Sequence, residues 1–234
     1  MNRLIATDLD CSRRNPGARS PRPRRLDLTM LRRLGWDGRL SIAYRRYDRP
    51  DQWPARVSRV ERGVCTLLGG GGVCRASLGG SALVAGARDP ARLPCVGDWV
   101  VVRTWPDARW TVELVLPRRG TMWRTPGPAL SASNVDIVMR VDRDRRSDAD
   151  LIGALRALLA PGHTLGLTGG EMGSRAALVA ALAGAPVLAP VAGSLVLLPG
   201  GGAVIDAESD CFSTDIDEID SSMPMPLSLA RRPA

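Results

Sequence analysis

The residues with the clearest potential for chemistry lie in a glycine-rich stretch, GLTGGEMGSRAAL, at positions 166–178. An apolar run precedes it and a helix-forming run follows it, which is the order of a phosphate-binding loop. In such a loop, backbone N–H groups hold phosphate oxygens, a lysine neutralises their charge, and a Ser or Thr hydroxyl holds Mg²⁺. The stretch therefore raises the question of whether this chain binds a nucleotide.

The loop departs from the pattern G-x-x-x-x-G-K-[ST] at three positions. If Gly173 is the second glycine, Thr168 stands where the first glycine belongs. Ser174 then takes the lysine position, and Arg175 takes the position of the Mg²⁺-binding hydroxyl. All 32 basic residues are arginine, so no lysine elsewhere can supply the amine. A glycine-rich turn before a helix holds an anion at most, and ordinary strand–turn–helix packing is the simpler explanation of the stretch taken alone.

A second candidate ligand is Asp206, at the end of the apolar stretch 194–206. A P-loop GTPase uses an aspartate at such a strand end to reach Mg²⁺, in an Asp-x-x-Gly motif. Ser209 replaces that glycine, and its side chain would obstruct a γ-phosphate. The candidate site for GTP or GDP with Mg²⁺, in a weakened or lost form, comprises Thr168, Gly169, Gly170, Gly173, Ser174, Arg175 and Asp206.

Positive charge is concentrated in the first half of the chain. Residues 1–124 carry 24 Arg against 11 acidic residues, a net charge of +13. Residues 125–234 carry 8 Arg against 13 acidic residues, a net charge of −5. A basic half joined to an acidic half indicates that the first half meets a polyanion.

Arginines and a tryptophan of the basic half form a candidate RNA-binding set. Arg56, Arg59 and Arg62 recur every three residues, and in a regular strand this spacing alternates faces, so the three would not meet one surface. Small barrels bind single strands or loops with arginine on phosphates and aromatic rings on bases. The alternative is that Trp99 and Trp110 fill the core and the arginines are only solvated. The set comprises Arg56, Arg59, Arg62, Arg75, Arg103, Trp105, Arg118, Arg119 and Arg124.

Two blocks of predicted elements position these residues. Short strands with glycine turns over 54–117 predict an all-β barrel of the OB type. Strands alternating with helices from Val135 predict a small α/β layer. The predicted organisation is a disordered basic arm (1–25), a helical segment with a turn at Gly35 (26–53), an OB-fold RNA-binding domain (54–124), a degenerate GTPase-like domain (132–210) and a flexible tail (211–234).

Several classes of protein are disfavoured. The five cysteines are odd in number and lack C-x-x-C spacing, so neither a disulfide framework nor a zinc site follows. The single histidine, His163, has no partner for a metal site or a catalytic triad. There is no signal-peptide pattern at the N-terminus and no apolar run long enough to span a bilayer. We therefore expect a cytoplasmic protein.

Seven blocks in order carry a resemblance to a known family. Together they resemble the circularly permuted GTPases that depend on the small ribosomal subunit (the RsgA family, also called YjeQ or EngC). The blocks are LGWD (34–37), PARVSRVERGVCTLL (54–68), LPCVGDWVVVR (93–103), VLPRRGTMWR (115–124), ASNVDIVMRV (132–141), LRALLAPGHTLGLTGGEMGSRAALVAALAG (155–184) and LVLLPGGGAVID (195–206).

This resemblance implies a barrel that contacts rRNA, a permuted GTPase domain and a C-terminal zinc module. It also implies GTP hydrolysis stimulated by the small subunit during its maturation. The chain departs from that pattern repeatedly. Only DRDRRSD (142–148) stands where the guanine-reading motif belongs, and APVLAPVAG (185–193) replaces the threonine-rich switch. The Cys/His zinc module is missing.

We therefore expect a monomeric protein that binds rRNA or the small ribosomal subunit, with GTP-binding motifs largely lost and no zinc. One alternative is a weak GTP-binding or GTP-hydrolysing enzyme, in which the Gly169–Gly173 turn holds phosphates and Arg175 replaces the lysine charge. Another is a truncated, non-functional product whose α/β half does not fold.

Overall fold

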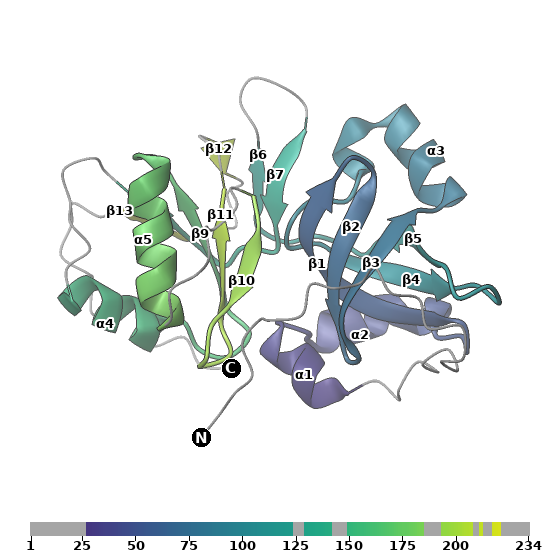
Figure 1. The fold of residues 1–234 in the computed structure, drawn as a ribbon, viewed down its shortest axis with the longest axis horizontal. Coiled ribbons are helices and arrows are strands. Elements are labelled where there is room, and N and C mark those ends of the chain that lie inside the picture. Colours follow the sequence, from purple (N-terminus) through teal and green to yellow (C-terminus); the bar gives the residue numbers. More distant parts are fainter. Residues whose placement is uncertain are drawn as a thin grey trace.

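The computed structural model describes residues 27–123, 129–141, 149–184, 193–207, 211–212 and 217–220. They form a β-barrel and an α/β sheet that lie against each other, with two helices on the far side of the sheet (Figure 1). Arg124, the expected arm (1–25), the whole stretch 142–148, all but the last residue of 185–193, and most of the tail lie outside these residues.

Two short helices precede the barrel, α1 (Leu28–Arg33) and α2 (Gly38–Tyr44), followed by the 3₁₀ turn η1 (Arg45–Tyr47). The carboxylate of Asp27 caps α1 by accepting hydrogen bonds from the N–H groups of Thr29 and Met30. Gly35 makes the turn between the two helices at φ +93°, as the sequence predicts. Leu31, Leu34 and Trp36 of this segment are buried against barrel residues such as Trp99.

The barrel closes in the order β1-β2-β3-β5-β4, which confirms the predicted OB-type barrel. Its strands are β1 (Gln52–Glu61), β2 (Val64–Gly69), β3 (Gly72–Leu78), β4 (Trp99–Thr104) and β5 (Trp110–Val115). Alternate residues fill the interior, among them Ala55, Val57, Leu67, Val100 and Val102. A helix that the sequence analysis did not predict, α3 (Gly80–Arg88), and the turn η2 (Pro90–Arg92) connect β3 to β4.

A bulge in β1 changes which side chains share a face. Val57 pairs with Leu67 and Arg59 pairs with Thr66, so Ser58 is the extra residue. Arg56 pairs with Leu68, which lies on the same side of β2 as Thr66. The bulge therefore places Arg56 and Arg59 on one face, and the expectation that their three-residue spacing would separate them is wrong.

The α/β half is a five-stranded sheet in the order β10-β11-β9-β8-β13. Its strands are β8 (Ile137–Arg140), β9 (Thr164–Thr168), β10 (Leu195–Leu197), β11 (Ala203–Asp206) and β13 (Asp217–Asp220). Only β10 is antiparallel to its neighbour. The expected mixed α/β region is therefore present.

Each face of this sheet is covered by a different part of the molecule. Helices α4 (Ala149–Leu158) and α5 (Met172–Ala183) pack on one face, where Leu155 and Leu178 meet Leu167 (Figure 1). On the other face, Val138 and Ile205 pack with residues of β6 (Thr121–Trp123), β7 (Leu130–Ser133) and the loop before β4.

The segment expected to be a flexible tail contributes two strands. β12 (Cys211–Phe212) pairs with β6, and β13 runs parallel to β8. Backbone hydrogen bonds of a ladder do not require apolar side chains, so an acidic segment can occupy a sheet edge. None of the helices in the described ranges is long and apolar enough to cross a membrane.

Candidate functional site

The glycine-rich loop joins β9 to α5, the strand–turn–helix order that the sequence predicts. Gly169 and Gly170 make the turn at φ +67° and +60°. A Cβ on Gly170 would lie 1.9 Å from the carbonyl oxygen of Val141, so only glycine fits there. A Cβ on Gly173 would meet nothing within 4 Å, so the described structure has room for a side chain at this position.

Arg175 extends from the first turn of α5 into the loop and is 6% exposed. Its Nε lies 2.5 Å from Oδ1 of Asp206, at the end of the adjacent parallel strand β11. Its Nη1 donates to the carbonyl oxygens of Gly169 at 2.8 Å and Gly170 at 3.1 Å. The second carboxylate oxygen of Asp206 is buried, with no hydrogen-bond partner among the described residues.

This arrangement is the electrostatic opposite of a phosphate cradle. A phosphate-binding loop turns N–H groups toward the ligand. Here the guanidinium of Arg175 draws two carbonyl oxygens and a carboxylate toward itself, and these are groups that repel a phosphate. The space bounded by Gly169, Gly170 and Asp206 is a cation site, and Arg175 is the cation in it.

The other residues of the candidate nucleotide set have structural roles. Thr168 is 1% exposed, and its carbonyl oxygen accepts a hydrogen bond from the N–H of Val141 at 2.7 Å. Ser174 is partly exposed, and its N–H donates to the carbonyl oxygen of Glu171 within the first turn of α5. Across the described ranges there is no group of three or more His, Cys, Asp or Glu side chains that could hold a metal ion.

Arg56, expected to face RNA, is 1% exposed. Its guanidinium donates to the carbonyl oxygens of Leu34 at 2.5 Å, Gly97 at 3.2 Å and Asn134 at 3.1 Å, and to the hydroxyl of Thr164 at 2.8 Å. Burial lowers the pKa of Arg56 to about 10, partly offset by the charge of Asp136. All three guanidinium nitrogens donate to protein acceptors and the side chain is buried, so the expectation of an RNA contact is wrong for this residue.

Arg118 and Arg119 also hold protein segments together. Arg118 makes two hydrogen bonds to the buried Asp98, at 2.7 and 2.6 Å, and binds the carbonyl oxygens of Ala91 and Leu93. Burial opposes its charge, but the bonds and charge of Asp98 outweigh this and raise the pKa of Arg118. Arg119, 39% exposed, bridges Asp37 at 3.3 Å and Asp136 at 3.2 Å.

The remaining members of the RNA-binding set are more exposed and lie on the barrel. Arg59 and Arg75 flank Thr66 in one row across β1, β2 and β3, with side chains 38% and 62% exposed. Glu61 pairs with both, Arg75 at 3.9 Å. The exposed Arg62 occupies the adjoining turn at φ +43°. We refer to Arg59, Arg62 and Arg75 as the arginine row.

A second, partly exposed group lies at the C-terminal end of β4. The guanidinium carbon of Arg103 stands 4.3 Å from the ring centroid of Trp105, and Arg103 pairs with Asp51 at 2.9 Å. Trp99, in contrast, is 1% exposed and fills the core, as the alternative interpretation held. The buried thiols of Cys65 and Cys95 have raised pKa values, about 12 for Cys65, because burial disfavours the thiolate.

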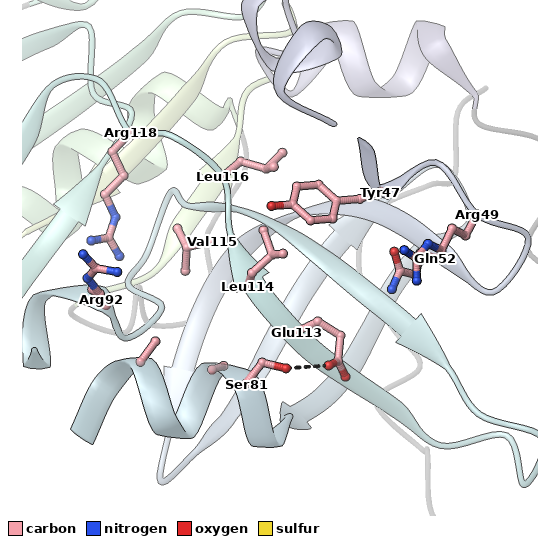
Figure 2. A pocket seen from close by; sticks show the side chains of 12 residues that line it. Tyr47, Arg49, Gln52, Ser81, Arg92, Glu113, Leu114, Val115, Leu116 and Arg118 are labelled. Atoms are coloured by element: carbon pink, nitrogen blue, oxygen red, sulfur yellow. Dashed lines mark hydrogen bonds between the residues drawn. The ribbon is translucent and has the colours of Figure 1, made fainter. Parts of the chain in front are cut away.

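The structure also contains a groove of about 550 Å³ on the outer face of the barrel, between α3, β5 and η1 (Figure 2). Residues far apart in the sequence line it, among them Tyr47, Arg49, Ser81 and Glu113. No spacing in the sequence indicates this groove, because four separate segments converge on it only when the barrel has closed.

Comparisons with known proteins show that part of this chain is similar to GTPases of small ribosomal subunit biogenesis. No family model matches it. The small ribosomal subunit biogenesis GTPase RsgA of Syntrophotalea carbinolica is 33% identical over 123 residues, 47% of this chain and 33% of that protein. RsgA of Streptomyces avermitilis is 37% identical over 107 residues, 44% of this chain and 28% of that protein. RsgA of Opitutus terrae is 34% identical over 131 residues, 49% of this chain and 35% of that protein. The matched segment thus spans about a third of each relative.

The fold has a match among solved structures. The crystal structure of YjeQ from Thermotoga maritima superposes with a TM-score of 0.51 at 15% identity, over 68% of this chain and 75% of that one. The match covers the five-stranded barrel followed by a mixed α/β region. Over about half of its length, this chain is therefore a distant homologue of the RsgA/YjeQ proteins.

Proposed function

We propose that this chain binds rRNA of the small ribosomal subunit through its barrel and does not hydrolyse GTP. The relatives that it matches are named for biogenesis of the small ribosomal subunit. Such a role would be carried out in the cytoplasm by a protein that needs neither bound nucleotide nor zinc.

The observation that carries the RNA contact is the arginine row. Arg59 and Arg75 project from the same face of three adjacent strands, and Arg62 extends that charge onto the turn between β1 and β2. Only one acidic side chain, Glu61, pairs with Arg59 and Arg75 among the described residues, which leaves the surface net positive. Arginines held at fixed spacing on a sheet are suited to successive phosphates of a nucleic acid strand.

The contacts of Arg175 support the loss of GTP chemistry. A phosphate that entered the loop would have to displace Arg175 and would then face the carboxylate of Asp206 and two carbonyl oxygens. Leaving that buried carboxylate without its cation costs several kcal/mol. The hydrogen bonds of Arg175 already hold the loop in place, so a nucleotide bound there would gain little favourable free energy.

Co-sedimentation with purified small ribosomal subunits tests the RNA contact. We expect the chain to pellet with subunits at low salt and to be released as salt rises, because each phosphate contact releases a counterion. The double variant Arg59→Ala/Arg75→Ala should bind at least about tenfold more weakly and show a shallower salt dependence. The control Arg39→Ala/Arg88→Ala removes the same charge at exposed positions outside the row and should bind nearly as wild type.

Two results would contradict the proposal. The absence of pelleting at low salt, or equal weakening by both double variants, would exclude a specific contact at the arginine row. Titration with a fluorescent GTP analogue, with and without subunits, tests the second part of the proposal, the loss of GTP chemistry. We expect no saturable binding at millimolar nucleotide, and saturable binding with turnover would restore the enzyme alternative.

A further inference from the structure

The groove between α3, β5 and η1 has the size and the lining of a ligand site. Its volume of about 550 Å³ falls within the range of about 300–1,000 Å³ typical of such sites. Arg59 and Arg75 do not line it, so it is separate from the arginine row. Figure 2 shows Tyr47 and Leu114 facing each other across the middle of the groove, with polar side chains toward both ends.

The middle of the groove offers a surface for a flat, apolar group. Leu114 and Val115 of β5 and Leu116, which follows it, form one wall, and Ala82 and Ala85 of α3 form another. Tyr47 adds a partly exposed aromatic ring, one side of which is next to the guanidinium of Arg46 at 5.0 Å. Unpaired RNA bases bind on aromatic rings of this kind, with about 1–3 kcal/mol per stacked base.

Positive groups stand at both ends of the groove. Arg92 and Arg118 lie at one end and Arg49 lies at the other (Figure 2). Arg118 is held in place by its two bonds to Asp98, whose carboxylate also balances its charge, so the free positive charge at this end comes from Arg92. Arg49 and Arg92 are exposed, Arg92 with only a loose pair to Asp89 at 3.6 Å, so both can reach an incoming phosphate.

Acceptors complete the lining. The carboxylate of Glu113 accepts hydrogen bonds from Ser81 at 3.1 Å and from Thr111 at 2.5 Å, which fix it beside the apolar wall. Gln52, at the same end as Arg49, has a buried Oε1 without a partner among the described residues. A carboxylate within a cationic groove is suited to a ligand that carries hydroxyl donors as well as phosphate, and the ribose 2′-hydroxyl of RNA is such a donor.

We propose that this groove holds one unpaired nucleotide of a bound RNA strand, with its base against Tyr47 and Leu114, its phosphates at Arg49 and Arg92, and its 2′-hydroxyl on Glu113. This inference rests on the proposed RNA-binding function and adds a second contact with a stated chemistry. It assigns to the barrel a preference for unpaired RNA over both DNA and free nucleotide.

Oligonucleotide binding at low salt tests this assignment. The probes are a fluorescein-labelled single-stranded RNA 12-mer of mixed sequence, its DNA counterpart, and AMP. Wild type should bind the RNA at least about threefold more tightly than the DNA and should show no saturable binding of AMP at millimolar concentration. Tyr47→Ala and Arg49→Ala should each weaken RNA binding at least about fivefold, and Glu113→Gln should reduce the preference for RNA over DNA.

Matched variants separate this inference from the proposed function. Arg88→Ala removes an exposed arginine of α3 that does not line the groove, and it should bind RNA as wild type. If Tyr47 matters to folding, which thermal unfolding would reveal, the exposed Arg49→Ala alone decides the outcome.

If Arg59→Ala/Arg75→Ala abolishes RNA binding but the groove variants do not weaken it, the groove assignment fails while the RNA-binding function stands. Equal binding of RNA and DNA by wild type, or saturable binding of AMP, would also overturn the assignment, and no RNA binding at all would overturn both.

Discussion

Arg175 and Asp206 close the glycine-rich loop from inside, and this pair is the basis of the proposed loss of nucleotide binding. The pair is nearly fully buried, and a buried ion pair is sensitive to the removal of one partner, because the remaining charge stays out of water. The position that a nucleotide-binding loop gives to a small hydroxyl residue is therefore occupied here by a long cationic side chain that binds the protein itself.

Arg175→Ala should lower the free energy of unfolding by about 3–5 kcal/mol, because Asp206 keeps its buried carboxylate without a cation. Urea unfolding followed by circular dichroism measures this loss. The double variant Arg175→Ala/Asp206→Ala should recover part of it. Ser174→Ala, at the preceding and partly exposed position, should change stability by no more than about 0.5 kcal/mol. A loss in Arg175→Ala as small as that of Ser174→Ala would show that the pair does not hold the loop.

At the scale of elements, the connection from β9 to α5 keeps the backbone shape of a glycine-rich loop for packing reasons. Gly170 is wedged against the carbonyl group of Val141, which follows the neighbouring strand β8. Gly173 lies in the helix with open space around it. In the sequence motif Gly173 holds the second glycine position and Gly170 holds an unspecified one, but only Gly170 is required by the described structure.

Gly170→Ala and Gly173→Ala form a matched pair that tests this distinction. Gly170→Ala should destabilise the protein by about 2 kcal/mol or more, because it adds a clash to an unfavourable positive φ. Gly173→Ala should leave stability unchanged or raise it by up to about 1 kcal/mol, because alanine favours the helical conformation. Thermal unfolding of the two variants provides the comparison, and similar effects of both would contradict the assigned roles.

At the scale of the whole molecule, buried polar contacts join the barrel to the α/β sheet. Arg56 of β1 bonds at once to the N-terminal segment through Leu34, to the loop before β4 through Gly97, and to the α/β half through Asn134 and Thr164. Close backbone contact between Gly35 and the carbonyl oxygen of Gly162 adds to this junction. The two halves are therefore expected to unfold together.

Arg56→Leu should break this cooperativity. It removes the Arg56 donor from the carbonyl groups of Leu34 and Asn134, whereas Gly97 keeps a hydrogen bond from Asn134 Nδ2. A loss of about 3 kcal/mol corresponds to a fall in Tm of about 6–12 °C for a chain of this size. Hydrogen exchange should show the barrel and the sheet opening separately in this variant. Arg59→Leu, the same substitution on the same face of β1, serves as the control and should retain a single transition with a nearly unchanged Tm. A single, unshifted transition in Arg56→Leu would refute the role of this arginine.

The sequence by itself determined the class of fold and the order of the barrel strands and the central α/β elements, but not α3, β12 or β13. Glycine turns between short β-rich runs predicted the barrel, and Leu151, Leu155, Leu158 and Leu159 at helical spacing predicted a helix that the structure has at α4. These features are local, since each depends on neighbours a few residues apart. The absence of lysine from the loop was equally a property of the sequence alone.

Only the tertiary structure decided which arginines are available and what fills the loop. Arg56 and Arg59 have the same residue type and lie three positions apart, yet one is sealed in a junction and the other lies on the surface, because the bulge at Ser58 and the N-terminal helices set their surroundings. Asp206 meets Arg175 because β11 pairs with β9, and the groove exists because β5, α3 and η1 converge. These contacts join residues that are distant in the chain, so no local pattern could specify them.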